Sequence, residues 1–128
     1  MYVTDTHALL WYLTGDGRLG KEARRIFSKA DRGELKVFIP TIVLAEALFV
    51  AEKHRIGMEF IEILENIRKS RNYIIYPMDA EVVIKCKDLN RIPELHDRIL
   101  VSTAKILRAK VLTKDREIAR SGVVETIW

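Results

Sequence analysis

Hydrophobic residues occur along this chain in two patterns, short continuous runs and longer stretches with a helical period. The short runs predict strands at residues 2–4, 36–39, 73–76, 110–113 and 124–127. The periodic stretches predict helices over residues 6–14, 20–32, 41–55, 58–69, 80–90, 96–108 and 115–120. Because strands and helices alternate, we expect a parallel sheet covered on both faces, with right-handed crossovers. The pattern therefore predicts a three-layer α/β/α domain.

The length and composition fit one globular domain spanning residues 1–128. The chain is 48% apolar and 31% charged, and it is long enough to bury a core without disulfides. Its single cysteine, Cys86, lies in a helical pattern, which favours a structural thiol in a reducing compartment. The longest apolar stretch, residues 40–51, is interrupted by Glu46 and is shorter than the about 20 residues that cross a membrane. The start of the chain has no signal-peptide pattern, so we expect a cytoplasmic protein without membrane contact.

The charge balance favours an anionic partner. The chain carries 22 Lys and Arg against 18 Asp and Glu, a net charge of +4. A basic exterior suits a polyanionic substrate, although this signal alone is weak. The helix expected over residues 20–32 has a basic stripe at Lys21, Arg25, Lys29 and Arg32. This stripe is either a solvated face or a phosphate-contacting surface.

Four carboxylates belong near one edge of the expected sheet. Asp5 ends the first strand, and Asp115 follows the end of the fourth. Asp97 begins the helix that descends into the fourth strand, so it starts at the same edge. Glu46 lies in the second turn of the helix after the second strand, about 8–9 Å from that helix's start at ~1.5 Å per residue. Open α/β sheets bind ligands at this edge, so the four acids form a candidate site.

Each acid also has a structural explanation. Three of the four precede helices, where Asp is a favoured N-cap residue worth about 1 kcal/mol. Asp79 has the same context, and because it has no partner acid we interpret it as a cap. Glu46 is different, since it is the only charge in residues 40–51 and burying an unpaired carboxylate is costly. It must meet a cation, a hydrogen-bond network or a cleft.

A group of four carboxylates at one edge predicts bound metal ions. Oxygen ligands without a nearby cysteine suit hard cations, Mg²⁺ or Mn²⁺. Two divalent ions would neutralise four carboxylates, and such pairs stabilise the attacking and leaving oxygens of phosphoryl transfer. The chain has no Walker loop, no dinucleotide-binding glycine motif and no Cys or His cluster for zinc. These absences argue against nucleotide-cofactor and zinc chemistry.

Four short segments carry a resemblance to a known family. They read Asp5-Thr6-His7-Ala8-Leu9-Leu10-Trp11, Leu44-Ala45-Glu46, His96-Asp97-Arg98-Ile99-Leu100-Val101 and Val111-Leu112-Thr113-Lys114-Asp115. In order and spacing over the whole chain they resemble PIN-domain proteins, particularly the VapC-type toxin ribonucleases of toxin–antitoxin pairs. The resemblance implies a PIN-like sheet with strand order 3-2-1-4-5, which makes strands one and four neighbours. It also implies Mg²⁺- or Mn²⁺-dependent endonucleolytic cleavage of RNA.

The resemblance implies roles for individual residues as well. The implied metal ligands and catalytic acids are Asp5, Glu46, Asp97 and Asp115. A metal-bound water would attack the phosphodiester in line. Thr113 would orient Asp115 or that water, and Thr6, beside Asp5, is a second auxiliary candidate. The candidate RNA contacts are Arg98, Lys21 and Arg25, with a salt bridge to the acids as the alternative for Arg98.

The chain departs from the family's pattern before the descending helix. Relatives often carry Asp-Pro-Phe-Asp-Arg there, whereas this chain reads Glu94-Leu95-His96-Asp97-Arg98. Asp97 keeps its place, but Glu94 replaces the earlier acid, so we leave Glu94 and the later Glu117 out of the ligand set. His7 is interpreted as part of a helix start and not as a ligand. His96 is a candidate donor or base beside the ligands.

The implied partners are RNA, a small antitoxin protein and a second copy of the chain. The helix pair over residues 41–69 has more apolar residues than one sheet face needs, among them Leu48, Phe49, Phe60, Ile61, Ile63 and Leu64. We expect part of it to form a homodimer or antitoxin-binding surface. The alternative is an ordinary two-helix layer of the core.

Other functions stay open on the sequence. A DNA nuclease, or an RNA-processing enzyme without an antitoxin, would have the same acids, since substrate choice depends on surface shape and 2′-OH contacts. A non-catalytic PIN-like binding or assembly module is a further alternative, and the intact acids at all four positions count against it. A phosphatase with Asp5 as nucleophile fits less well, because such enzymes usually carry a second aspartate where His7 stands.

Overall fold

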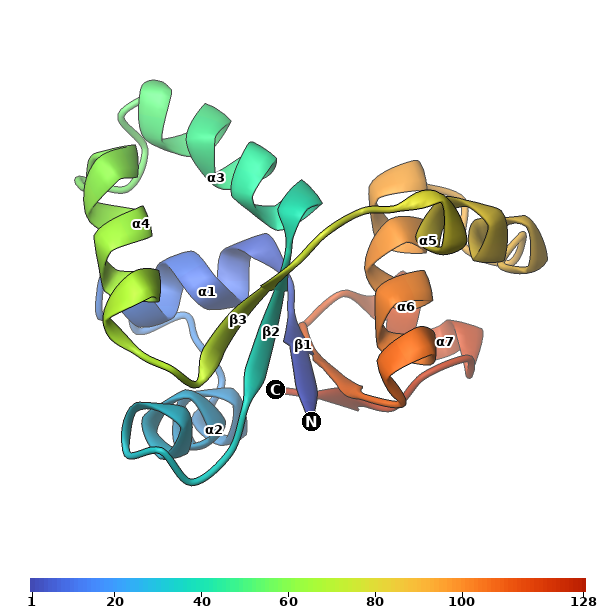
Figure 1. Cartoon of the computed structure of the whole chain (residues 1–128), viewed down its shortest axis with the longest axis horizontal. Coiled ribbons are helices and arrows are strands. Elements are labelled where there is room, and N and C mark those ends of the chain that lie inside the picture. Colours follow the sequence, from blue (N-terminus) through green and yellow to red (C-terminus); the bar gives the residue numbers. More distant parts are fainter.

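The centre of the molecule is a five-stranded sheet, seen in a computed structural model that describes all of residues 1–128 (Figure 1). The strands are β1 Tyr2–Thr4, β2 Val37–Pro40, β3 Tyr73–Tyr76, β4 Lys110–Leu112 and β5 Thr126–Ile127. Every neighbouring pair runs parallel, in the order β3-β2-β1-β4-β5. The expected order 3-2-1-4-5 is therefore confirmed.

Helices cover both faces of the sheet, which confirms the three-layer α/β/α architecture. They are α1 Thr6–Leu13, α2 Lys21–Asp31, α3 Thr41–Glu52, α4 Phe60–Lys69, α5 Ala80–Lys85, the 3₁₀ turn η1 Cys86–Asp88, α6 Leu95–Leu107 and α7 Arg116–Ser121. Figure 1 shows α1 to α4 on one side of the sheet and α5 to α7 on the other. None of these helices is both long and apolar enough to span a membrane.

The main error in the predicted elements concerns the helix expected over residues 80–90. This helix is shorter and tightens into η1, because Leu89 and Ile92 turn inward and are buried in the core. Cys86 is buried at the start of that turn, where its thiol donates to the carbonyl of Val82 at 3.3 Å. It is a structural thiol, as the sequence predicts.

A hydrogen-bond network ties the outer helices to the sheet. Tyr73 in β3 and Tyr12 in α1 both donate to the carboxylate of Asp31, the last residue of α2. The Tyr73 bond measures 2.6 Å, and Tyr12 stacks on Phe27 with ring centroids 4.7 Å apart. Burial and the hydrogen bond to Asp31 raise the pKa of Tyr12 to about 12, so its hydroxyl remains a donor. The network fixes the far end of α1, whose first turn builds the candidate site.

Candidate active site

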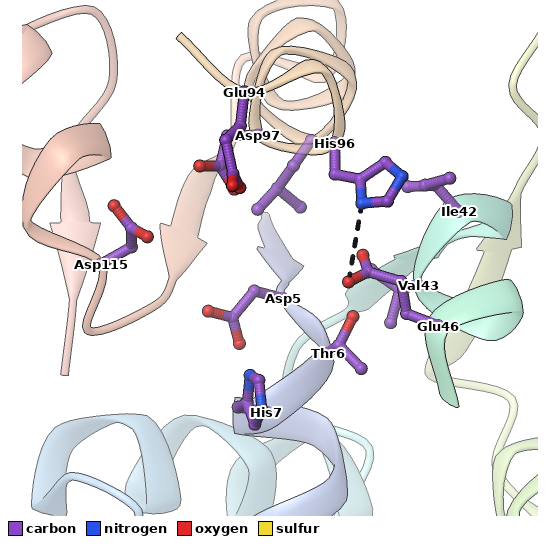
Figure 2. A pocket seen from close by; sticks show the side chains of 11 residues that line it. Asp5, Thr6, His7, Ile42, Val43, Glu46, Glu94, His96, Asp97 and Asp115 are labelled. Carbon is purple, nitrogen blue, oxygen red and sulfur yellow. Dashed lines mark ion pairs between the residues drawn. The ribbon is translucent and has the colours of Figure 1, made fainter. Parts of the chain in front are cut away.

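A cavity of about 180 Å³ opens at the edge of the sheet where the parallel strands end (Figure 2). Its polar lining consists of Asp5, Thr6, His7, Glu46, Glu94, His96, Asp97 and Asp115. Ile42, Val43 and Leu100 complete it with apolar side chains. The four acids expected from the sequence thus line one cavity, and Glu94 is a fifth.

Asp5 occupies the centre of this edge because it directly follows β1. Its backbone N–H donates to the carbonyl of Leu112 in β4 at 3.1 Å. Its Oδ1 accepts from the backbone N–H of Ala8 at 2.8 Å and so caps α1. Its Oδ2 accepts from the Thr113 hydroxyl at 2.5 Å. Both oxygens are held, which gives the carboxylate one defined orientation.

Thr113 joins the two central strand ends. It is 2% exposed, and its hydroxyl donates to Asp5 and accepts from the backbone N–H of Asp115 at 3.1 Å. We expected Thr113 to orient Asp115 or a metal-bound water. In the structure its hydroxyl contacts the backbone of Asp115, and the carboxylate that it contacts is that of Asp5. The side chain of Asp115 is held by a different group. Its Oδ1 accepts from the Ile118 N–H at 3.1 Å and caps α7.

Asp97 and Glu94 reach the cavity from the start of α6. The helix expected from His96 begins instead at Leu95, so Asp97 is its third residue. No protein group forms a hydrogen bond or ion pair with the Asp97 side chain, which removes capping as its explanation. Glu94 stands at the N-cap position without a side-chain cap bond. Burial, followed by the negative charges of the other four acids, raises the pKa of Asp97 to about 6.

The negative charge of this edge is not balanced by the protein. Burial raises the pKa of Asp5, although the hydrogen bonds from Thr113 and Ala8 and the charge of His7 act in the opposite direction. None of the five acids forms an ion pair with a Lys or an Arg. Carboxylates gathered in this way repel one another unless a cation joins them.

Glu46 faces the other acids from the second turn of α3. Its side chain is 38% exposed, and its Oε2 lies 3.9 Å from the Nδ1 of His96, the contact dashed in Figure 2. The predicted alternative, a structural ion pair, has no Lys or Arg to form it. Glu46 therefore lies in a cleft, and its nearest basic neighbour is the exposed His96, which shares the cavity.

The oxygen donors at this edge suit a hard divalent cation such as Mg²⁺ or Mn²⁺. The Thr6 hydroxyl is buried without a hydrogen-bond partner, and Figure 2 shows it directed into the cavity beside Glu46. Leaving such a group unpaired costs about 1–3 kcal/mol, which a ligand in the cavity would recover. No three His, Cys, Asp or Glu side chains stand close enough to hold one ion as they are. Since Glu46, Glu94 and Asp97 have no hydrogen bonds to break, they can turn inward.

The three predicted RNA contacts do not line this cavity. The Nε of Arg98 donates to the carbonyl of Ile92 at 2.5 Å, so its guanidinium is turned toward the loop before α6 and forms no salt bridge with the acids. Arg25 pairs with Glu22 on α2 at 2.8 Å. Lys21 is the first residue of that helix. Their contact with RNA stays a prediction.

Sequence reasoning left Glu94 and His7 out of the site, and both line the cavity. Glu94 lies three residues before Asp97, the spacing that places two side chains on one helix face, and this spacing is the signal that could have identified it. His7 lies only two residues after Asp5, a spacing that does not place helix residues on one face. The sequence therefore carries no comparable signal for His7.

The fold recurs in solved structures of other proteins. A chain of the VapBC2 complex from Rickettsia felis, bound to a promoter DNA fragment, has a TM-score of 0.75 at 15% identity, covering 98% of this chain and 96% of that chain. FitAcB from Neisseria gonorrhoeae has a TM-score of 0.74 at 16% identity, with 100% and 97% covered. VapC20 from Mycobacterium tuberculosis, described as a Sarcin-Ricin loop cleaving toxin, has a TM-score of 0.72 at 17% identity, with 98% of each chain covered.

The sequence itself also matches a known domain. No curated protein matches the chain, but the profile of the PIN domain matches residues 2–123. The structural neighbours, VapC and FitB toxins of toxin–antitoxin complexes, share the fold over nearly the full length of both chains. With a profile match that covers almost the whole sequence, the chain belongs to the PIN-domain family.

Proposed function

We propose that this chain is a Mg²⁺- or Mn²⁺-dependent endoribonuclease that serves as the toxin of a toxin–antitoxin pair. The observation that carries the proposal is the group of five acids around one cavity, none of them paired with a Lys or an Arg. The side chains of three of the five, Glu46, Glu94 and Asp97, form no helix-capping hydrogen bond. Uncompensated acids at the edge of a parallel sheet suit divalent ions and phosphodiester chemistry.

The implied metal ligands are Asp5, Glu46, Asp97 and Asp115. A divalent ion held by them would activate the attacking water and neutralise the charge that develops on the phosphate. Thr113 and Ala8 hold both oxygens of Asp5, and the first turn of α7 holds one oxygen of Asp115. These two acids form the rigid half of the site. The other two have no hydrogen bonds and supply the adjustable half.

RNA is the proposed substrate, and the cytoplasm is the proposed location of the protein. The net charge of +4 supports a polyanionic substrate, although the acids themselves are concentrated in one cavity. One protein of the same fold, VapC20, is described as cleaving the Sarcin-Ricin loop. A DNA nuclease would use the same acids, so the assay must compare both nucleic acids.

The test is a cleavage assay on the purified chain, free of any antitoxin, with RNA and DNA of one sequence. We expect Mn²⁺ to support RNA cleavage, EDTA to abolish it and DNA to stay intact. Asp5→Asn is expected to lower kcat by about 100-fold or more, since it weakens a metal ligand. If the wild-type chain with Mn²⁺ cuts no RNA, the proposal fails.

Asp79→Asn is the matched control. Asp79 caps α5 as Asp5 caps α1, its Oδ1 accepting from the Val82 N–H at 3.0 Å, but it does not line the cavity. Asparagine is also a good N-cap residue, so both variants keep their helix starts. We expect Asp79→Asn to cut RNA at the wild-type rate.

We also propose that the α3–α4 surface binds the antitoxin. Of the six apolar side chains expected there, Ile63 is buried and Leu48, Phe60 and Leu64 are half-buried. Phe49 and Ile61 are 65% and 60% exposed. One structure with this fold is a toxin–antitoxin complex from Klebsiella pneumoniae, which supports an antitoxin as the partner. Phe49→Ser should weaken co-purification with the proposed antitoxin.

A homodimer is proposed on the opposite helical layer. Ile84 in α5 is 70% exposed and Leu95, the first residue of α6, is 64% exposed. α5 packs against α6, and a contiguous exposed apolar patch shared by two such helices would mark a protein interface. Light scattering should give twice the chain mass for the wild type and a smaller mass for Ile84→Asp. A wild-type monomer would contradict the dimer.

A further inference from the structure

An aromatic and basic cluster lies beside the acid cavity and contains none of the proposed ligands. Its centre is Trp11, in the second turn of α1. The Arg18 guanidinium lies 4.7 Å and the Lys114 ammonium 4.6 Å from the centroid of the Trp11 ring. His7, which lines the cavity, has its ring centroid 5.4 Å from that of Trp11. The cluster therefore adjoins the cavity wall.

The ring at the centre of the cluster is firmly held. Trp11 is 5% exposed, and Trp128 meets it edge-on with ring centroids 5.8 Å apart. Trp128 in turn packs on Gly20, where an added Cβ would collide with the backbone of Trp128. A cation over the face of a tryptophan is attracted by the electrons of the ring. A cation attracted to this ring is thus kept in one place.

The two cations on the ring differ in how their charge is balanced. Arg18 forms a two-point pair with Asp16, through Nε at 3.1 Å and Nη2 at 2.8 Å. Lys114 is exposed and forms no ion pair. Its place between Thr113 and Asp115 keeps it next to the acid site. Lys114 is therefore an unpaired positive charge that packs on an aromatic ring and forms no ion pair with the neighbouring acids.

We propose that Lys114, held over Trp11, binds a phosphate of the RNA strand next to the one that is cut. The inference rests on the proposed function and assigns part of the substrate contact to this side of the site. Five acids repel a polyanionic strand, so the phosphates that flank the cut need cations outside the ligand set. Lys114 supplies one beside the cavity, next to Asp115 in the sequence. Its contact with Trp11 keeps the Lys114 ammonium from pairing with the proposed metal ligands.

The test measures RNA binding without cleavage. A labelled single-stranded oligoribonucleotide is titrated with the Asp5→Asn protein, with and without Lys114→Gln, at several salt concentrations. Losing one phosphate contact to a single strand lowers the slope of log K against log salt by about 0.7. We expect Lys114→Gln to show this drop and a roughly threefold to tenfold weaker affinity at low salt. Lys114→Arg should restore both, because a guanidinium also stacks on tryptophan and binds phosphate.

The matched control is Lys87→Gln, which removes the same charge from an exposed position in η1 that does not line the cavity. Its slope should equal that of the parent. An unchanged slope in Lys114→Gln, or a drop of equal size in Lys87→Gln, would overturn the inference while leaving the proposed function intact. Failure of Lys114→Arg to restore binding in a normally folded protein would also overturn it. A parent that binds no RNA would overturn this inference, and a wild-type chain that also cuts no RNA with Mn²⁺ would overturn the proposed function with it.

Discussion

Thr113→Val tests whether one hydroxyl sets the geometry of the central acid. Thr113 is buried and valine has nearly its shape, so the substitution removes the hydroxyl without opening a large cavity. The hydroxyl's bond to Asp5, at 2.5 Å, is charge-assisted and worth about 1.5–3 kcal/mol. Its bond from the Asp115 N–H, at 3.1 Å, is of the neutral kind, worth about 0.5–1.5 kcal/mol.

The two losses predict effects on both stability and metal binding. We expect the free energy of unfolding to fall by about 2–4.5 kcal/mol, the sum for the two hydrogen bonds. The hydrogen bond from Thr113 lowers the pKa of Asp5, so its removal makes this carboxylate bind protons more readily. Groups that orient a metal ligand typically change metal affinity by about 10–100-fold, and we expect the affinity for Mn²⁺ to fall in that range.

The assay needs a variant that keeps the hydroxyl. Thr113→Ser does so, and it should retain most of the stability and the Mn²⁺ affinity of the wild type. Urea unfolding at neutral pH gives the stability, and calorimetric titration gives the affinity. Equal Mn²⁺ affinity in the valine and serine variants would refute the role assigned to Thr113. An equal loss of stability in both would show that packing, and not hydrogen bonding, fixes this position.

Three further predictions concern charge. Without divalent ions, folded Asp97 keeps its proton to about pH 6 whereas the unfolded chain releases it near 3.8, so the free energy of unfolding should fall as pH rises between these values. After solvent screening the fall is about 1–2 kcal/mol, and urea unfolding should show that Asp97→Asn removes it. Mn²⁺ at about 100 times its Kd should add about 2.7 kcal/mol of stability at neutral pH. It should add much less at low pH, and equal stabilisation in a calorimeter at both would contradict carboxylate ligation. Tyr73→Phe should lower the unfolding free energy by about 1.5–3 kcal/mol in urea, and an unchanged value would contradict a stabilising Asp31 network.

The position of Asp5 beside Asp115 could be predicted because it depends on backbone topology. Parallel strands end at one edge, and the pairing of Thr4 with Leu112 brings the residues that follow them together. Periodicity in the sequence predicted the alternation of strands and helices. The resemblance supplied the strand order that makes β1 and β4 neighbours.

The outward surfaces could not be predicted in the same way. α3 is apolar on nearly all sides, so its pattern does not mark the face that packs on the sheet. In the structure Ala47 is buried and Phe49 is exposed. The direction of Arg98 is a similar case. Its bond to the Ile92 carbonyl depends on the course of the loop before α6, which no spacing rule describes.

Asp79 and Asp5 show how one local rule leads to two different roles. Each accepts a backbone N–H three residues later, at 3.0 Å and 2.8 Å, and each starts a helix. Capping is a sufficient explanation for Asp79, as the sequence predicts. It is not sufficient for Asp5, whose pKa is raised by burial, with Asp115 adding to the rise, although both of its oxygens are hydrogen-bonded. A helix cap does not require four further carboxylates nearby. The acids whose side chains cap no helix only add repulsion, which destabilises the fold. The proposed cation would account for what capping leaves unexplained, because it would turn the mutual repulsion of these carboxylates into attraction to a shared ion.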